Sequence, residues 1–491
     1  MHELLQNCIG GEWGVSGTGR TSSNINPATG EVLGAFTVSD EADVDRAVAA
    51  ASAAFPAWRA TPAPKRAHVV LEAWRLLGER AKEVATALTL EEGKVFAESM
   101  GEVTKSRSIL EFMAGEGRRL NGETIPSELP NTFAWTQLDP LGVVGLITPW
   151  NFPIAIPFWK IAPAIVSGNT CVFKPAEQTP WTGDLVTRIF QDAGLPAGVL
   201  NLVHGFGEDC GDRIVRHPEV KAISFTGSNP VGTHIYATAA AQLKKVQCEM
   251  GGKNPIIVME DADLELAIAS AAAGAFASTG QRCTATSRAI VHEDVVEAFV
   301  AGVQKKAVEY RPGPGMDSQF NVGPVVDSGQ FETVMKYIEI GKSEARLVTG
   351  GFAVTDGACA GGHFVAPTLF TDVAPDARIA QEEIFGPVLS VISVKSLDEA
   401  LEVANSVEYG LSSSLYTQDV NRVFRYMSEV ETGITHINSA TVGGEAHVPF
   451  GGMKATGVGA REMGKTAIEF FTEVKSCYVD YTGTLRTGHT Y

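Results

Sequence analysis

Cys283 is the residue of this sequence that most directly suggests chemistry. It lies in the stretch STGQRCTATSR, residues 278–288, after a glycine and between an arginine and small hydroxyl residues. Arg282, the local backbone N–H groups and the hydroxyls are expected to favour the thiolate, which is the nucleophilic form of cysteine. Most single cysteines are instead buried structural thiols. This stretch alone therefore leaves two alternatives, a nucleophile and a buried thiol.

Asn151 and Glu249 each follow a short apolar run. Asn151 stands between prolines in PWNFP, where its amide can donate to a developing oxyanion, although an isolated asparagine is more often a turn residue. Glu249 precedes two glycines in CEMGGKNP. Apolar neighbours such as Met250 would raise its pKa and let it deprotonate a water molecule, whereas most lone glutamates are solvated.

Two further motifs suit a dinucleotide. FTGSNPVG places Gly227 and Ser228 between a strand and a helix start, where free N–H groups and the helix dipole favour a pyrophosphate. A glycine required by a tight turn is an equal alternative, since the spacing is not GxGxxG. FKPAEQTP carries Lys174 and Glu177 three residues apart. These can hold ribose hydroxyls, with a solvated surface pair as the alternative.

Hydrophobic periodicity predicts the elements that position these residues. Apolar residues recur at helical spacing after Asp40 and again at 70–77, so the first hundred residues are expected to be largely helical. From Val143 onward, short apolar runs alternate with helix-length stretches, which indicates a parallel α/β sheet. A second series follows Cys283 and predicts a second α/β domain. The order of the motifs places the boundary near residues 251–252.

Composition limits the class of protein. The chain has 491 residues, 44% hydrophobic, with a formal net charge of −18, so two or three domains are expected and a partner such as nucleic acid or an anionic membrane is not. Neither an export signal nor a membrane span is predicted, which favours the cytoplasm. Seven widely spaced cysteines form no CxxC pair, so neither a disulfide framework nor a metal site is expected.

Taken together, the motifs resemble those of the aldehyde dehydrogenase superfamily and follow in family order. They are PWNFP, KPAEQTP, FTGS, EMGGKNP, GQRCT, EEIFGP and PFGGMKATGVG, spanning residues 149–459. The resemblance implies an α/β fold with three parts. These are a Rossmann-like NAD(P)-binding domain (1–121 and 142–251), a second α/β catalytic domain bearing the cysteine (252–450), and a β oligomerisation arm (122–141 and 467–491) of a homodimer or homotetramer.

The resemblance also implies roles. Cys283 matches the nucleophile, Asn151 the oxyanion donor and Glu249 the base that hydrolyses a thioester intermediate after hydride has passed to the nicotinamide. The matching cofactor-binding positions are Lys174 and Glu177 at the adenosine ribose, Gly227 and Ser228 at the pyrophosphate, Glu383 and Phe385 at the nicotinamide ribose, and Trp150. A carboxylate at Glu177 accepts from ribose hydroxyls and repels a 2′-phosphate, so NAD is expected to be preferred over NADP.

The substrate is an aldehyde whose identity the sequence leaves open. The motifs are most similar to those of the α-ketoglutaric semialdehyde branch, which converts 2,5-dioxopentanoate to 2-oxoglutarate. Trp159 and Ala277 stand where succinic semialdehyde branches place arginines, which leaves Arg282 as a candidate for an anionic tail. Phe158 and Trp159 would instead line the entrance for an apolar or aromatic aldehyde.

Two rival activities share the nucleophile. A cysteine hydrolase would need a histidine base and has no use for the cofactor motifs. A CoA-acylating relative would not need Glu249, since hydrolysis is what that base provides.

Overall fold

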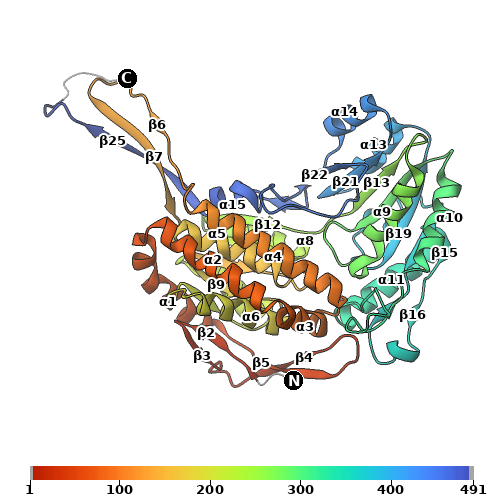
Figure 1. The fold of residues 1–491 in the computed structure, drawn as a ribbon, viewed down its shortest axis with the longest axis horizontal. Helices are drawn as coiled ribbons and strands as arrows, with labels where there is room; N and C mark the ends of the chain where they lie inside the picture. Colours follow the sequence, from red (N-terminus) through yellow and green to blue (C-terminus); the bar gives the residue numbers. More distant parts are fainter. Residues whose placement is uncertain (1–3, 486–491) are drawn as a thin grey trace.

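The computed structural model describes residues 4–485. Two large β-sheets, each covered by helices, lie side by side, and a narrow arm extends away from them (Figure 1). The mixed α/β fold predicted from the sequence is confirmed.

The first 37 residues contribute strands. Their bounds are β1 (Leu4–Leu5), β2 (Asn7–Ile9), β3 (Glu12–Gly14), β4 (Thr21–Ile25) and β5 (Val32–Thr37). β2 pairs with β10, nearly 200 residues further along the chain, and β1 with β5. The expectation of a largely helical first hundred residues is wrong for this segment. Such short strands are stabilised by pairing with neighbouring strands, here β2 with β3 and β10 and β4 with β5, and helical periodicity does not report this.

Four helices follow, which agrees with the helical periodicity predicted after Asp40 and at 70–77. They are α1 (Glu41–Ala60), α2 (Ala63–Glu79), α3 (Ala81–Glu92) and α4 (Phe96–Glu116). Asp40 caps α1, because its carboxylate accepts from the backbone N–H groups of Ala42 and Asp43. The apolar face of α1 is buried at Val44 and Val48.

The first large sheet has the strand order β24-β12-β11-β8-β9-β10-β2-β3. Its bounds are β8 (Val143–Ile147), β9 (Thr170–Lys174), β10 (Leu200–Leu202), β11 (Val220–Thr226), β12 (Lys245–Glu249) and β24 (Gly457–Val458). The run from β12 to β10 is parallel, as expected. Its intervening helices are α5 (Ala155–Ser167), α6 (Pro180–Asp192), α7 (Asp212–Arg216) and α8 (Asn229–Ala240), with the π-helix η1 (Gly207–Gly211).

The second large sheet has the order β15-β18-β19-β14-β13-β21-β22. Its bounds are β13 (Asn254–Val258), β14 (Thr286–His292), β15 (Arg346–Thr349), β18 (Thr368–Thr371), β19 (Val388–Val394), β21 (Ser412–Tyr416) and β22 (Ile434–Ile437). Its helices are α9 (Leu264–Phe276), η2 (Ala277–Gly280), α10 (Val296–Ala307), α11 (Ser328–Glu344), η3 (Gly357–Cys359), α12 (Arg378–Gln381), α13 (Leu397–Asn405) and α14 (Val420–Glu429). The chain passes between the two sheets at residues 250–253.

The arm is a three-stranded sheet in the order β25-β7-β6 (Figure 1). Its strands are β6 (Thr124–Ile125), β7 (Thr132–Pro140) and β25 (Thr472–Asp480), and α15 (Gly464–Phe470) leads into it. Two small pairs complete the fold, β16 (Ala353–Val354) with β17 (Phe364–Val365) and β20 (Tyr409–Gly410) with β23 (Met453–Lys454). Within residues 4–485, no helix is long and apolar enough to cross a membrane. The domain ranges stay a prediction.

Candidate active site

A cavity of about 250 Å³ lies at the carboxyl ends of β8, β11 and β12, where the first sheet faces the loops of the second. Ligands of parallel sheets bind at this edge. Most of the residues singled out in the sequence line it: Trp150, Asn151, Trp159, Gly227, Ser228, Glu249, Cys283, Glu383 and Phe385. The other four, Phe158, Lys174, Glu177 and Arg282, do not.

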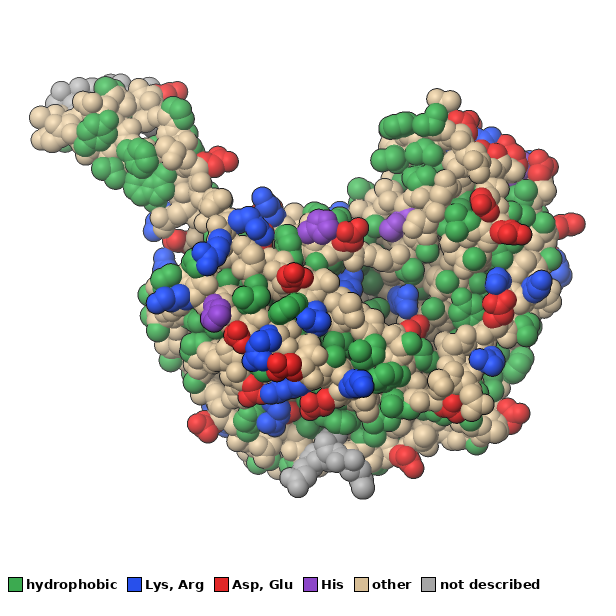
Figure 2. Space-filling model, in the orientation of Figure 1, with side chains coloured by type: hydrophobic (Ala, Val, Ile, Leu, Met, Phe, Trp, Pro, Cys, Tyr) green, Lys and Arg blue, Asp and Glu red, His purple; other side chains and the backbone are tan. Residues whose placement is uncertain are grey.

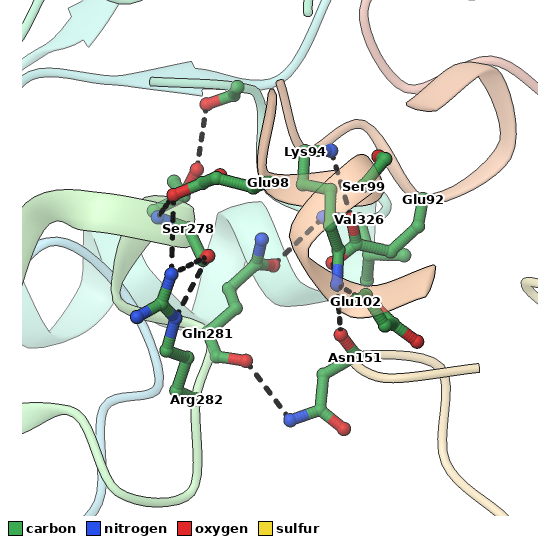
Figure 3. A network of polar contacts seen from close by, with 12 residues as sticks. Glu92, Lys94, Glu98, Ser99, Glu102, Asn151, Ser278, Gln281, Arg282 and Val326 are labelled. Atoms are coloured by element: carbon green, nitrogen blue, oxygen red, sulfur yellow. Dashed lines mark hydrogen bonds and ion pairs between the residues drawn. The ribbon is translucent and has the colours of Figure 1, made fainter. Parts of the chain in front are cut away.

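Asn151 is held against the cysteine loop. Its side-chain amide donates to the backbone carbonyl of Gln281 over 3.0 Å. The backbone carbonyl of Asn151 accepts from the ammonium of Lys94 over 2.6 Å (Figure 3). Lys94 also pairs with Glu102 at 2.7 Å. An asparagine amide carries two N–H groups, so this arrangement leaves one to donate to a substrate oxygen.

The backbone ahead of Cys283 is strained. Ser278, Thr279 and Gly280 have φ angles of 48°, 57° and 66°, three successive residues in the left-handed region. A Cβ at Gly280 would lie 2.1 Å from a backbone oxygen, so only glycine fits. Strain of this kind persists where surrounding contacts hold it, and it gathers at functional sites.

Asn254 fixes the loop from the second sheet, and sequence reasoning missed it. Its amide nitrogen donates to the carbonyls of Cys283 and Ala285 over 2.7 and 2.9 Å. It stands in CEMGGKNP, a motif interpreted only through Glu249, and its contact partners lie about 30 residues away. The sequence signal that could have identified Asn254 is a polar residue at the start of a buried strand, where its side chain needs hydrogen-bond partners.

The surroundings of Cys283 do not favour the thiolate. Burial, followed by the charges of Glu249 and Glu383, raises the pKa of the thiol to about 12, while Lys105 lowers it. Arg282 does not stabilise the thiolate as expected. Its guanidinium instead donates to the hydroxyl of Ser278 and pairs with Glu98 at 3.3 Å (Figure 3). The resting thiol is therefore protonated at neutral pH.

Glu249 ends β12 and is only 3% exposed. One carboxylate oxygen accepts from the N–H of Gly452 over 3.2 Å. A Cβ at Gly451 would lie 2.3 Å from the other oxygen, so the GG of PFGGMK makes room for this side chain. Burial and then the neighbouring Glu462 raise its pKa well above 4.5, which brings it toward the range of a base at neutral pH.

Glu383 also lines the cavity and comes from the part of the chain that leads into the second sheet. Its carboxylate accepts from the N–H of Gly252 over 2.8 Å, and burial raises its pKa to about 7. A Cβ at Gly251 would lie 2.2 Å from one of its oxygens, which explains the second glycine pair. Phe385, at φ 55°, packs nearly perpendicular to the Trp150 ring with 5.4 Å between centroids.

The glycine turn before α8 differs in one detail from expectation. Ser228 precedes the helix and makes no side-chain capping bond, so the first turn keeps its N–H groups for a ligand. The N–H of Gly227, however, donates to the backbone carbonyl of Glu249 over 3.1 Å and is not free. The hydroxyl of Thr226, also in the cavity wall, is buried without a partner in the described chain.

Lys174 and Glu177 do pair, at 3.1 Å, at the end of β9. Lys174 is buried and Glu177 is one-third exposed, so the pair is not the solvated surface pair of the alternative interpretation. Neither residue lies in the cavity wall itself. Across residues 4–485, no cluster of histidine, cysteine, aspartate or glutamate side chains is arranged to hold a metal ion.

Trp159 and Phe158 lie on different faces of α5. Trp159 lines the cavity and packs on Phe450 with ring centroids 5.5 Å apart. Phe158 is fully buried and packs on Phe190, so the expectation that it lines the entrance is wrong. Adjacent helical residues point about 100° apart, which prevents both rings from facing one cavity.

The chain is similar to proteins of a known family over most of its length. The model described as "Aldehyde dehydrogenase family" matches residues 13–477. The chain therefore belongs to the aldehyde dehydrogenase family, and it is an oxidoreductase that oxidises an aldehyde.

Two curated relatives carry related names. A Haloferax volcanii protein named alpha-ketoglutarate semialdehyde dehydrogenase is 45% identical over 98% of this chain and 100% of its own. A Saccharolobus solfataricus protein named 2,5-dioxopentanoate dehydrogenase is 43% identical over 94% of this chain and 97% of its own. The solved structure of betaine aldehyde dehydrogenase from Staphylococcus aureus, in complex with NAD+, matches with a TM-score of 0.96 at 32% identity over 99% of this chain and 97% of that chain.

Proposed function

We propose that this protein oxidises 2,5-dioxopentanoate to 2-oxoglutarate through a cysteine thioester, with NAD as its preferred cofactor. The observation that carries the mechanism is a single cavity lined by a cysteine, a buried glutamate and a side-chain amide. The substrate rests on the two relatives named for it.

Cys283 attacks the aldehyde carbon as its sulfur loses a proton to water, and the carbonyl oxygen becomes an alkoxide. The free N–H of the Asn151 amide and the backbone N–H of Cys283 donate to that oxygen, each contributing on the order of 3 kcal/mol. After hydride departs, Glu249 takes a proton from a water molecule that attacks the thioester carbon. The carbon–sulfur bond then breaks, Cys283 leaves as the thiolate and the carboxylic acid is released.

A nicotinamide dinucleotide, when bound, supplies the hydride acceptor. The chain fits it, since the buried hydroxyl of Thr226 lacks a partner in the described chain and Gly251 leaves space for the Glu383 carboxylate. Family-matched positions would hold it: Lys174 and Glu177, Gly227 and Ser228, Glu383 and Phe385, and Trp150. The charge of Glu177 supports NAD over NADP, because a carboxylate repels the 2′-phosphate.

The rival activities fit less well. A cysteine hydrolase needs a histidine base, and none is among the described residues that line the cavity. A CoA-acylating enzyme would have no use for Glu249 as a base. An apolar or aromatic aldehyde is the second candidate substrate, favoured by the rings of Trp159 and Phe450 in the cavity wall.

We also propose that the arm joins copies into a homodimer or homotetramer in the cytoplasm. Apolar side chains are exposed on the arm and on α14, and green atoms gather at both places in Figure 2: Val474, Tyr478 and Tyr481, and Val420, Phe424 and Met427. Surfaces of this kind mark protein contacts. The cysteines, all unpaired in the described chain, suit a reducing compartment.

A panel of aldehydes with NAD or NADP, followed by the absorbance of the reduced cofactor with and without CoA, tests this function. We expect the highest kcat/KM for 2,5-dioxopentanoate with NAD, and no effect of CoA. A CoA requirement or a higher kcat/KM for an aromatic aldehyde would overturn it. Light scattering of the purified protein tests the assembly.

A further inference from the structure

Lys105 is a cation beside the cavity that no step of the mechanism uses. It lies on α4, half-buried, and its ammonium is 5.7 Å from the centre of the Trp159 ring. It is also close enough to Cys283 to lower the pKa of the thiol. Its one hydrogen bond is to the backbone carbonyl of Gly444, over 2.9 Å.

Lys105 differs from three other cations around the site in lacking a carboxylate partner. Three neighbours are each neutralised by an ion pair: Lys94 with Glu102, Lys160 with Glu462, and Arg282 with Glu98. For Lys105, no carboxylate among residues 4–485 lies within ion-pair distance. A half-buried ammonium bonded to a neutral carbonyl keeps most of its charge available for an anion.

Trp159 provides an independent observation that points to a polar ligand. The residue is 5% exposed and lines the cavity, yet its indole N–H has no hydrogen-bond partner in the described part of the chain. A buried donor without a partner costs free energy, so buried tryptophans normally donate to an acceptor. An oxygen-rich substrate tail would satisfy this N–H, whereas an aliphatic or plain aromatic tail would not.

Resting on the proposed function, we infer that Lys105 and the indole N–H of Trp159 together bind the carboxylate end of the substrate. They would replace the two arginines that succinic semialdehyde branches place at the positions of Trp159 and Ala277. The ammonium neutralises the carboxylate, and the indole donates to an oxygen of the same 2-oxo acid group. The aldehyde end then reaches Cys283, so the pair selects aldehydes that carry a carboxylate at the far end.

Kinetics with two substrates of equal chain length test this inference. The values of kcat/KM for 2,5-dioxopentanoate and for pentanal are measured in wild type, Lys105→Gln, Lys105→Arg and Trp159→Phe, with NAD saturating. For 2,5-dioxopentanoate we expect a loss of about 10- to 100-fold in Lys105→Gln, carried by KM, and about 3- to 10-fold in Trp159→Phe. Pentanal should change less than about 3-fold, and Lys105→Arg should restore most of the loss.

Lys221→Gln is the matched control. This exposed lysine also bonds to a backbone carbonyl, at 3.2 Å, but stands at the opposite end of β11 from the cavity. It should leave both substrates unchanged. Thermal unfolding of each variant checks that the fold persists.

The outcomes distinguish a wrong substrate from a wrong role for Lys105. If wild type shows no preference for 2,5-dioxopentanoate over pentanal, the proposed substrate is wrong and the inference falls with it. If wild type is selective and Lys105→Gln stays equally selective, only the inference is overturned. A parallel loss for both substrates would mean that Lys105 acts on Cys283 instead, which also overturns it.

Discussion

Replacing Glu249 with glutamine should separate the two halves of the reaction. Glutamine has nearly the same shape as glutamate. Its side-chain oxygen can still accept from the N–H of Gly452, which in the wild-type structure lies 3.2 Å from the carboxylate. The variant keeps that bond but has no basic oxygen. Acylation of Cys283 should therefore proceed, while hydrolysis of the thioester should slow by about 10²- to 10⁴-fold, the usual contribution of a general base.

Stopped-flow absorbance measures this directly. Mixing Glu249→Gln with NAD and aldehyde should give a burst of reduced cofactor close to one equivalent per active site, followed by a slow steady rate. Denaturation during the slow phase should trap substrate on Cys283, visible by mass spectrometry. Wild type should show neither a trapped adduct nor a slow phase of this size.

Alkylation of Cys283 by iodoacetamide provides a second readout. The charge of Glu249 raises the pKa of the thiol, so losing it should speed alkylation. Because burial raises the pKa of Glu249 well above 4.5, the wild-type carboxyl is neutral at low pH and the two rates should coincide there. The profiles should separate only at the pH where Glu249 ionises.

Stability should change in the same pH window. A carboxyl whose pKa is raised on folding binds its proton more tightly in the native state, so wild type loses stability as the pH rises from about 4.5 toward the folded pKa of Glu249. Glu249→Gln should lack this loss. A variant with no burst, or with slower alkylation at every pH, would contradict this role, since Glu249 would then be activating the thiol.

Three other substitutions give simpler outcomes. Cys283→Ala should reduce turnover below about 1% of wild type while NAD still binds, measured by kinetics and calorimetry. Glu177→Ser should narrow the ratio of kcat/KM for NAD over NADP, because the carboxylate that repels a 2′-phosphate is gone. Gly280→Ala should lower the free energy of unfolding by about 2–5 kcal/mol, because the backbone is left-handed and a backbone oxygen is close. Gly101→Ala, in an open position on α4, should raise the free energy of unfolding by about 0.5–1 kcal/mol.

Each has a contradicting result, and Cys283→Ala and Gly280→Ala also have a control variant. Cys477→Ala, a half-buried thiol on the arm, should keep full turnover, and measurable activity in Cys283→Ala would remove that residue as the nucleophile. A wild-type preference for NADP, or a ratio that Glu177→Ser leaves unmoved, would assign ribose recognition elsewhere. An unchanged free energy of unfolding in Gly280→Ala would show that the loop before Cys283 can relax to accept a side chain.

The sequence predicted the elements whose signals are local. The parallel strands from Val143 onward, the capped helix after Asp40 and the ordered motifs around the cavity were all accessible, because strand alternation and turn residues lie within short windows. The strands of residues 4–37 were not, since each is only two to six residues long and β2 pairs with β10, nearly 200 residues away.

The electrostatics of the site were beyond the sequence for a related reason. The neighbours of Arg282 in sequence suggested help for the thiolate, but its guanidinium turns to Ser278, and burial with Glu249 dominates the thiol. Lys105 was invisible as a site residue because its helix reaches the cavity only through tertiary packing. Charge distances across elements follow from the fold, and no motif reports them.

The carboxylate of Glu249 is held in place by a segment that follows the second sheet in the sequence. Glu249 is supported by Gly452, 203 residues further on, and its strand β12 is edged by β24, which returns from beyond the second sheet. Contacts between residues this far apart in the sequence form slowly during folding, because a long loop must close first. A folding intermediate that has not yet formed the pair of β12 with β24 would contain both Cys283 and Glu249, but the Glu249 carboxylate would lack the N–H of Gly452, so hydrolysis depends on a contact that forms late in folding.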